Sequence, residues 1–481
     1  MNFAIVRYLI GWMLGIESIF LLLPALTAVI YGEPELPAYL IPGAISLAGA
    51  ALLCHRKPKN TRFYAREGYV TVALCWLILA VIGALPFVLS REIPFFIDAL
   101  FETVSGFTTT GATILGDVEA LSHASMLWRC LTHWVGGMGV LVFMLIVLPL
   151  AGGQTIFLMR AESPGPSVSK MSPRMRDTAT ILYAIYFGLT VLQMILLLIG
   201  GMPFFDAICV SLGTAGTGGF GNWNDSIAHY NSAYLQNVIT VFMILFGINF
   251  SAYFLILTRK FRQAFRIEEI RVYLGVIFVF AGLIAFNVRP MFGSLRESFH
   301  HALFQVASII TTTGFSTVDF DQWPTFSRAL LVLLMFIGAC AGSTGGGIKC
   351  SRILLLGKSV KKELMCLIHP RLVRVNKMDG QRVPHEVMRS INVFVVAYAF
   401  IFILSLLIIS LNCEDLVTCF TSVATTLNNV GPGLSLCGPT CNFGFFPPLS
   451  KCVLIFDMLA GRLELFPMLL LFTPGTWQRN K

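Results

Sequence analysis

The chain has 481 residues, of which 56% are hydrophobic and 12% are charged, about half the charged fraction of a typical soluble domain. This composition excludes a water-soluble enzyme, and the forty phenylalanines exclude a disordered or fibrous chain. The net charge of +9 does not indicate a nucleic-acid partner, because the basic residues lie in blocks between apolar runs. The composition therefore predicts an all-α polytopic protein of the lipid bilayer.

Ten apolar runs are long enough to cross the hydrocarbon core, which takes about twenty residues per helix. They are 8–30, 38–54, 69–89, 126–150, 178–200, 234–257, 272–288, the run from 329 onward, 391–411 and 453–471. The first run contains Glu17 and no small-residue cleavage site follows it, so a retained span is favoured. A signal peptide stays open as the alternative because of Arg7.

Most of the lysines and arginines fall in four blocks, at 56–66, 160–176, 259–271 and 349–389. Loops on the cytoplasmic side of a membrane are enriched in Lys and Arg. The blocks and both termini are therefore expected to be cytoplasmic, which agrees with an even number of crossings.

Four segments between later pairs of runs resemble one another. Each has a short apolar stretch, typical of a re-entrant helix, and the segments 96–112, 204–220, 299–315 and 416–432 align without a gap. The short stretches are followed by Thr109, Thr110, Gly111; Thr217, Gly218, Gly219; Thr312, Thr313, Gly314; and Asn429, Val430, Gly431. Four ordinary capped interfacial helices are the alternative.

The repeats predict four pseudo-symmetric units of span, re-entrant pore helix and span around a central pore, after two extra N-terminal helices. The expected divisions are 1–66 for the N-terminal helices, and 67–176, 177–270, 271–388 and 389–481 for the four units.

The four Thr/Gly segments carry no charged residue. Glycine permits backbone conformations that turn carbonyl oxygens inward, and rings of such oxygens can replace the water around a weakly hydrated cation. An anion pore would need basic rings and a calcium pore acidic rings. The segments therefore predict a selectivity filter that binds K⁺ as the permeant ion, with Na⁺ as second choice.

A second glycine-rich segment, GACAGSTGGGIK at 338–349, interrupts the eighth run. A phosphate-binding loop is excluded because Ile348 separates Gly347 from Lys349 and no strand precedes it. A small-residue packing face is the alternative. The favoured interpretation is an intramembrane gate formed by Gly342, Ser343, Thr344, Gly345, Gly346, Gly347 and Lys349.

The last run carries Asp457, Arg462 and Glu464, which are costly in a bilayer without partners. Arg462 is predicted to face the pore cavity and to hydrogen-bond the glycine-rich loop, with an ion pair or a snorkelling side chain as the alternative. His133 is interpreted as a hydrogen-bonded packing histidine.

Two further charged residues and two cysteines lie near the predicted outer face. Arg129 and Lys451 are interpreted as interfacial anchors. Cys437 and Cys441 lie where a disulfide is permitted, though the sequence leaves their pairing open.

Together these residues resemble the TrkH/TrkG-type subunits of Trk potassium uptake systems, within the Trk/Ktr/HKT superfamily. The resemblance runs nearly end to end, and the two additional N-terminal runs resemble the TrkH branch. The motifs that carry it are AREGY at 65–69, TTTGAT at 108–113, HWVGGMG at 133–139, RAESPGP at 160–166, TTTGFST at 311–317, GACAGSTGGGIK at 338–349, LNNVGPG at 427–433 and GRLE at 461–464.

The resemblance implies filter glycines at Gly111, Gly219, Gly314 and Gly431, and a gate at 338–349 with Arg462. It also implies a homodimer in the bacterial inner membrane, regulated by a cytosolic TrkA-like subunit. A nucleotide, either ATP/ADP or NAD/NADH, is expected on that partner only, and no covalent cofactor is expected.

The expected function is potassium uptake through a channel-like pore. The interior-negative potential supplies about 2.3 kcal/mol per charge per 100 mV. The alternative is a potassium:proton or potassium:sodium symporter, which would need an acidic residue at mid-membrane such as Glu17, Asp457 or Glu464. A membrane-embedded enzyme is not favoured, because no catalytic cluster is visible.

Overall fold

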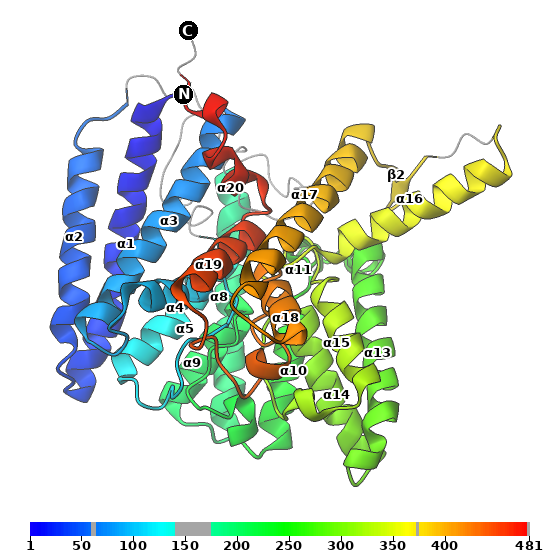
Figure 1. Cartoon of the computed structure of the whole chain (residues 1–481), viewed down its shortest axis with the longest axis horizontal. Coiled ribbons are helices and arrows are strands. Elements are labelled where there is room, and N and C mark those ends of the chain that lie inside the picture. The colour runs from blue at the N-terminus through cyan, green and yellow to red at the C-terminus, as the bar shows by residue number, and fades with distance from the viewer. Residues whose placement is uncertain (59–63, 140–174, 372–374, 479–481) are drawn as a thin grey trace.

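The computed structural model describes residues 1–58, 64–139, 175–371 and 375–478. Within this part of the chain, six helices are long and apolar enough to cross a membrane. These are α1 (Phe3–Tyr31), α2 (Leu36–Cys54), α3 (Ala65–Leu89), α8 (Met175–Ile199), α13 (Glu268–Val288) and α17 (His385–Ser410). The prediction of an all-α, multi-pass membrane protein is confirmed (Figure 1).

Both ends of the described chain lie at the same end of the molecule (Figure 1). The Met1 amino group donates a hydrogen bond to the carbonyl oxygen of Gln478 over 3.2 Å. Helices α1 and α2 pack as an antiparallel pair along one side of the molecule. Their close approach needs glycine, because a Cβ at Gly11 would lie closer than 3.0 Å to Leu53.

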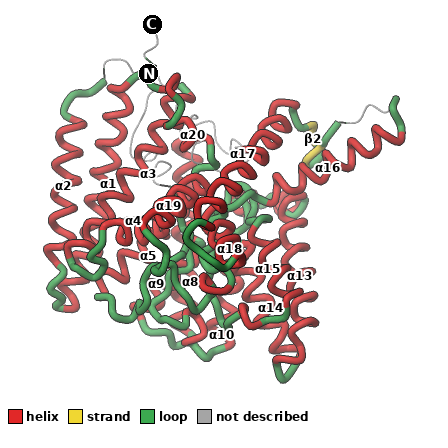
Figure 2. Tube along the Cα trace, viewed as in Figure 1, coloured by secondary structure: helices red, strands yellow, loops and turns green. Residues whose placement is uncertain are grey.

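Four short helices occupy the predicted re-entrant positions. With 12 to 16 residues they reach about 18–24 Å, less than the 30 Å hydrocarbon core. They are α4 (Phe96–Phe107), α9 (Phe204–Gly216), α14 (Leu295–Ile310) and α18 (Leu416–Leu427). Each ends at the Thr/Gly or Asn/Gly segment that the sequence singled out, and Figure 2 shows loop segments gathered near α9 and α18.

Three predicted runs are not single helices. Their pieces are α10 (Ala233–Phe246) with α11 (Phe250–Leu257), α15 (Thr325–Met335) with α16 (Cys350–Ile368), and α19 (Pro448–Arg462) with α20 (Phe466–Leu471). The axes of α10 and α11 differ by 93°. At this bend Gly247 O accepts from Cys340 N and Phe250 N donates to Gly342 O, so the glycine-rich loop satisfies the freed backbone groups.

Helix α5 (His123–Met138) packs against α1, α4 and α9 and begins the predicted run 126–150. The other described elements are short connectors: α12 (Phe261–Ala264), η2 (Ser226–His229), η3 (Arg289–Met291), η4 (Phe320–Gln322), η5 (Ser435–Cys437), η6 (Pro474–Thr476), β1 (Lys377–Met378) and β2 (Gln381–Arg382). The two strands pair antiparallel, with Lys377 opposite Arg382. The predicted run 126–150 is described only to residue 139, and the RAESPGP motif lies outside the described residues.

The expected divisions after residues 66, 176, 270 and 388 each fall in the first turn of a helix, namely α3, α8, α13 and α17. These helices therefore begin two to four residues earlier than the expected units.

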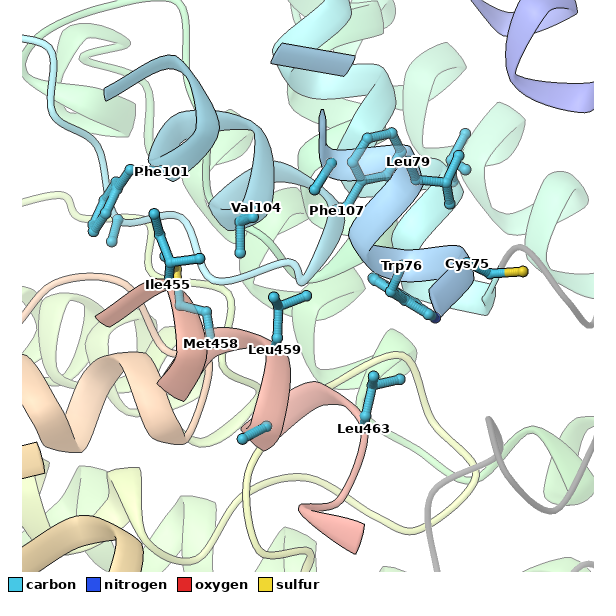
Figure 3. Packing of buried hydrophobic residues seen from close by; sticks show 14 of the residues in the cluster. Cys75, Trp76, Leu79, Phe101, Val104, Phe107, Ile455, Met458, Leu459 and Leu463 are labelled. Carbon is cyan, nitrogen blue, oxygen red and sulfur yellow. The ribbon is translucent and has the colours of Figure 1, made fainter. Parts of the chain in front are cut away.

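One packed layer brings the C-terminal end of the chain to the centre. Figure 3 shows Met458 and Leu459 of α19 beside Val104 of α4, with Trp76 and Leu79 of α3 nearby. Close packing of this kind holds helices together where the surrounding lipid is itself apolar. The layer places Arg462, the last residue of α19, beside the chain that follows α4.

Candidate functional site

The four segments that follow the short helices share one backbone conformation. The first residue of each has a left-handed φ, with values of 55° at Thr109, 55° at Thr217, 58° at Thr312 and 54° at Asn429. The glycine two positions later also has a positive φ, between 79° and 99°. A left-handed β-branched residue is rare, and three of these four positions are threonine, so the matching φ values indicate one geometry shared by the four segments.

The amide groups of these segments are committed to the preceding helices. Thr109 N donates to Gly106 O over 3.1 Å, and Thr110 N donates to Ser105 O over 2.9 Å. The other three segments repeat this pair of bonds, from Thr217 and Gly218, Thr312 and Thr313, and Asn429 and Val430. The amides therefore point back toward the helices.

The carbonyl oxygens of the same residues are not committed. The carbonyl groups of residues 109–111, 217–219, 312–314 and 429–431 accept no hydrogen bond from any residue that the structure describes. Most of these residues are fully buried, and buried carbonyl groups normally have a partner. We call these twelve residues the carbonyl ring.

The four segments meet in a closed cycle. A Cβ atom at Gly111 would come closer than 3.0 Å to Gly218 O, and one at Gly219 equally close to Thr313 O. A Cβ atom at Gly314 would lie 2.6 Å from Val430 O, and one at Gly431 would lie 2.6 Å from Thr110 O. Each segment therefore contacts the next and the fourth contacts the first, which leaves no room for a side chain at the four glycines.

A cavity of about 130 Å³ lies on one side of the carbonyl ring. All four glycines line it, together with Arg129 and residues that follow the ring segments, including Asn224 and Pro432. The glycine-rich loop lies on the opposite side.

The glycine-rich loop, residues 338–349, has no helix or strand and contacts the ring directly. Gly346 N donates to Thr312 Oγ1 over 2.7 Å. A Cβ at Gly346 would lie 2.7 Å from Asn429 Cβ, and one at Gly347 would lie 3.5 Å from Asn428 O. The loop therefore covers the third and fourth segments.

Other loop residues hold its own shape. Thr344 Oγ1 donates to Phe246 O over 3.2 Å, Ser343 Oγ donates to Cys340 O over 2.6 Å, and the Lys349 ammonium group donates to Gly345 O. Gly342 and Gly347 have φ values of 70° and 72°. Lys349 is 1% exposed, so its ammonium group interacts with the loop rather than with solvent.

Arg462 connects the loop to the first segment. Nη1 donates to Thr344 O over 2.8 Å and to Thr109 Oγ1 over 3.1 Å. Nη2 donates to the carbonyl oxygens of Gly136 and Gly137 over 2.6 and 2.7 Å. The planar guanidinium group thus joins four acceptors on three separate parts of the chain.

Glu269 is a site residue that sequence reasoning missed. Its Oε1 accepts hydrogen bonds from Ala341 N over 2.7 Å and from Ser351 N over 2.9 Å, so one buried carboxylate holds both ends of the loop. Near the second end, Arg352 Nη2 donates to Glu464 Oε2 over 2.6 Å. In the sequence, Glu269 lies among the other charged residues of the block 259–271 and does not stand out from them. Its position just before the apolar run 272–288 is the only sequence signal that could have identified it.

His133 links two segments. Its Nδ1 lies 2.7 Å from Gly106 O, and its Nε2 accepts from Phe220 N over 3.2 Å. This arrangement assigns the proton to Nδ1. The imidazole group of His133 also occupies the space that a Cβ at Gly218 would need. The histidine is hydrogen-bonded as predicted, and its partners follow or precede ring segments.

The interpretation of Arg129 and Lys451 as interfacial anchors is wrong. Arg129 is 2% exposed and its Nε lies 2.8 Å from Glu102 Oε1, whereas Lys451 Nζ lies 2.6 Å from Asp98 Oδ1. Both carboxylates belong to α4, and the pairing appears only when α5 and α19 pack against it. Glu102 also accepts from Thr113 Oγ1 and Ile114 N, and so fixes the chain beyond the first segment.

Cys437 and Cys441 are both free thiols in the structure. Asp457 is fully buried and accepts one hydrogen bond, from Ser405 Oγ over 2.7 Å. This bond joins α19 to α17.

Comparisons with known proteins find relatives that match nearly the whole chain. The family model described as TrkH, cation transport protein, matches residues 40–478. The Trk system potassium uptake protein TrkH of Salmonella typhimurium is 38% identical, covering 99% of this chain and 100% of that protein. The protein TrkG of Escherichia coli is 33% identical, covering 98% of each.

A solved structure is also similar. The crystal structure of the potassium transporter TrkH from Vibrio parahaemolyticus superimposes with a TM-score of 0.89 and 33% sequence identity. The similarity covers 99% of this chain and 100% of that one. The chain belongs to the TrkH family of cation transport proteins, a family of transporters rather than enzymes.

Proposed function

We propose that this protein conducts potassium ions across a bacterial inner membrane through a channel-like pore, and that the carbonyl ring is its selectivity filter. The observation that carries this proposal is the cycle of four equivalent segments, whose amides bond to their own helices while their carbonyl groups stay uncommitted. The relatives named above are called potassium uptake proteins, which fits the same ion.

The chemistry of the ring suits a weakly hydrated monovalent cation. Carbonyl dipoles can replace its water shell, and the neutral ring does not hold a divalent ion as acidic side chains would. The four short helices also end at the ring, so their negative dipole ends favour a cation there.

The glycine-rich loop and Arg462 are proposed as the gate. The loop lies against the ring on the side opposite the 130 Å³ cavity, and Arg462 adds a fixed positive charge beside it. A cation leaving the ring on this side would meet both the loop backbone and this charge. Conduction therefore requires the loop to move.

We also propose an orientation in the membrane and an assembly with other subunits. The blocks of Lys and Arg are proposed to face the cytoplasm, with both termini, by the positive-inside bias. The relatives are named as parts of a Trk system. We expect a homodimer regulated by a cytosolic TrkA-like subunit that binds the nucleotide, with docking along the basic region 358–382.

A potassium:proton symporter is the second candidate, and two buried carboxyl groups favour it. Glu17 is 1% exposed and neither of its oxygens has a partner among the described residues. Asp457 Oδ2 is also buried and has no hydrogen-bond partner among the described residues. A buried carboxyl group without a cationic partner can carry a proton.

Reversal potentials of the purified protein in proteoliposomes separate the two candidates. A channel selective for potassium gives a reversal potential that follows the potassium gradient and ignores an imposed proton or sodium gradient. A reversal potential that shifts with the proton gradient would replace the channel by the symporter. No potassium current or flux under any gradient would refute both.

A further inference from the structure

Two hydrogen-bond donors of the proposed gate end on side chains of the carbonyl ring itself. Gly346 N donates to Thr312 Oγ1 over 2.7 Å, and Arg462 Nη1 donates to Thr109 Oγ1 over 3.1 Å. Thr109 and Thr312 are the left-handed residues that open the first and third segments. Because the segments contact one another in the order one to four, these two threonines belong to opposite segments of the ring.

The equivalent residues of the other two segments also present side-chain oxygens. Thr217 Oγ1 donates to Gly216 O over 2.6 Å, which leaves its lone pairs without a described donor. Asn429 Nδ2 donates to Thr110 Oγ1 and Met458 O, whereas its buried Oδ1 has no partner among the described residues. The four equivalent positions thus supply four neutral oxygens, and the gate engages two of them.

The orientation of Asn429 supports a ligand at this level. Its amide donor is used twice, so the free oxygen is fixed in place rather than free to flip. A Cβ at Gly346 would lie 3.1 Å from this oxygen and one at Gly461 would lie 2.9 Å from it, so the oxygen lies between the loop and α19. A buried amide oxygen with no partner is costly unless something outside the described chain binds it.

We propose that the side-chain oxygens of Thr109, Thr217, Thr312 and Asn429 form a binding site for a weakly hydrated monovalent cation at the gate end of the ring, and that the closed gate competes with the ion for this site. The inference rests on the proposed pore and adds its regulation. The Gly346 N–H group and the Arg462 guanidinium group place positive charge at the hydroxyl oxygens that the cation would use.

Competition has a direct consequence for gating. An ion bound at this site stabilises the state in which the two donors have withdrawn, and the closed gate excludes the ion. Potassium should therefore raise the open probability, independently of its effect on current per channel. If the threonines only anchor the loop, their loss would loosen the gate equally at every potassium concentration.

The test uses single-channel recording of the full-length protein in planar bilayers, with K⁺ replaced stepwise by choline at constant ionic strength. The parent should open more often as K⁺ rises. In Thr109→Val/Thr312→Val, both gate donors lose an acceptor while the side-chain shape is kept, so the open probability at low K⁺ should rise at least about fivefold. Its dependence on K⁺ should be largely lost.

Two controls isolate the hydroxyl groups. Thr109→Ser/Thr312→Ser keeps both oxygens and should restore the behaviour of the parent. Thr103→Val removes a buried hydroxyl of α4 that donates only to Ala99 O, and should change neither open probability nor its K⁺ dependence. If the double variant does not fold, Thr312→Val alone carries the same comparison.

A double variant that keeps the K⁺ dependence of the parent would overturn the inference, even if it opened more often. A parent that conducts K⁺ but opens equally often at all K⁺ concentrations would overturn it as well. Both outcomes leave the proposed pore intact, whereas a parent without any K⁺ current refutes the proposed function instead.

Discussion

The carbonyl ring and the glycine-rich loop are both irregular, glycine-containing chain at the centre of the molecule, yet they are held in different ways. In the ring, each segment bonds its amides to the helix immediately before it, within about five residues along the chain. The loop also has internal bonds, but its attachment to the rest of the molecule uses distant side chains, chiefly Glu269 and Arg462, which lie 72 and 118 residues from their donor and acceptor.

This difference in attachment predicts a rigid ring and a releasable loop. A segment fixed by its own helix keeps its shape as long as the helix does, which suits a device that must recognise an ion. A loop fixed by a few remote contacts can be released as one piece when those contacts break. The comparison predicts that changes at the four ring glycines alter which ions pass, whereas changes at the contacts between the loop and its surroundings alter how often ions pass.

The largest effect is expected at a ring glycine. In Gly219→Ala the new Cβ would overlap Thr313 O and would sit at a φ of 81°, so two segments must separate. We expect K⁺ uptake by proteoliposomes to fall about 100-fold, or Na⁺ to pass, because a displacement of about 1 Å is severe in a precise site. Gly188→Ala on α8, with nothing within 4 Å, should match the parent. Normal selective uptake by Gly219→Ala would remove this segment from the filter.

The next effect is expected at the loop anchor. Glu269→Ala leaves two buried amide groups without a partner, at about 1–3 kcal/mol each, so the closed loop is destabilised. Leak of K⁺ from loaded proteoliposomes should rise about tenfold or more without loss of selectivity over Na⁺. The exposed carboxylate of Glu386 offers a matched control as Glu386→Ala. A leak no greater than that of the parent would show that the loop does not block conduction.

A smaller effect is expected at Arg462. In Arg462→Lys the charge remains, but an ammonium group cannot reach all four acceptors of the guanidinium fork. Loss of about 1 kcal/mol should raise the leak roughly fivefold. Arg462→Gln, which also removes the charge, should leak more. Equal leak in both variants would mean that geometry alone, and not charge, closes the pore.

The smallest effect is expected at an exposed ion pair. Lys358 of α16 pairs with Glu268, and both side chains are more than a quarter exposed, so the pair contributes at most about 1 kcal/mol. Lys358→Gln should change the basal leak by no more than about twofold. A leak as large as that of Glu269→Ala would show that α16 itself holds the loop closed.

The ends of the four short helices were predictable from the sequence because their signals are local. A short apolar stretch followed by Thr or Asn and then Gly determines both the end of the helix and the conformation beyond it. Four aligned copies made these residues visible, and the helices end one or two residues before the predicted segments. The contact between Arg462 and the glycine-rich loop was also expected, because a buried charge near a helix break needs acceptors.

The remaining features depend on which helices touch. The pairs of Glu102 with Arg129 and of Asp98 with Lys451 join residues 27 and 353 positions apart, and no local pattern marks them. The bend between α10 and α11 was missed because the run 234–257 is predominantly apolar on both sides of the bend. Its bend is stabilised by bonds to a loop some ninety residues away, which hydropathy does not report.

The most direct test of the central claim is to locate the ion. Crystals of this protein grown with Rb⁺ in place of K⁺, and measured at the rubidium absorption edge, report the position of the permeant cation by anomalous scattering. The account predicts density on the axis of the carbonyl ring, within coordination distance of carbonyl oxygens from all four segments, and no such density in matched crystals with Na⁺. Rubidium density that is absent from the ring, or that lies at carboxyl groups such as Asp457, would contradict it.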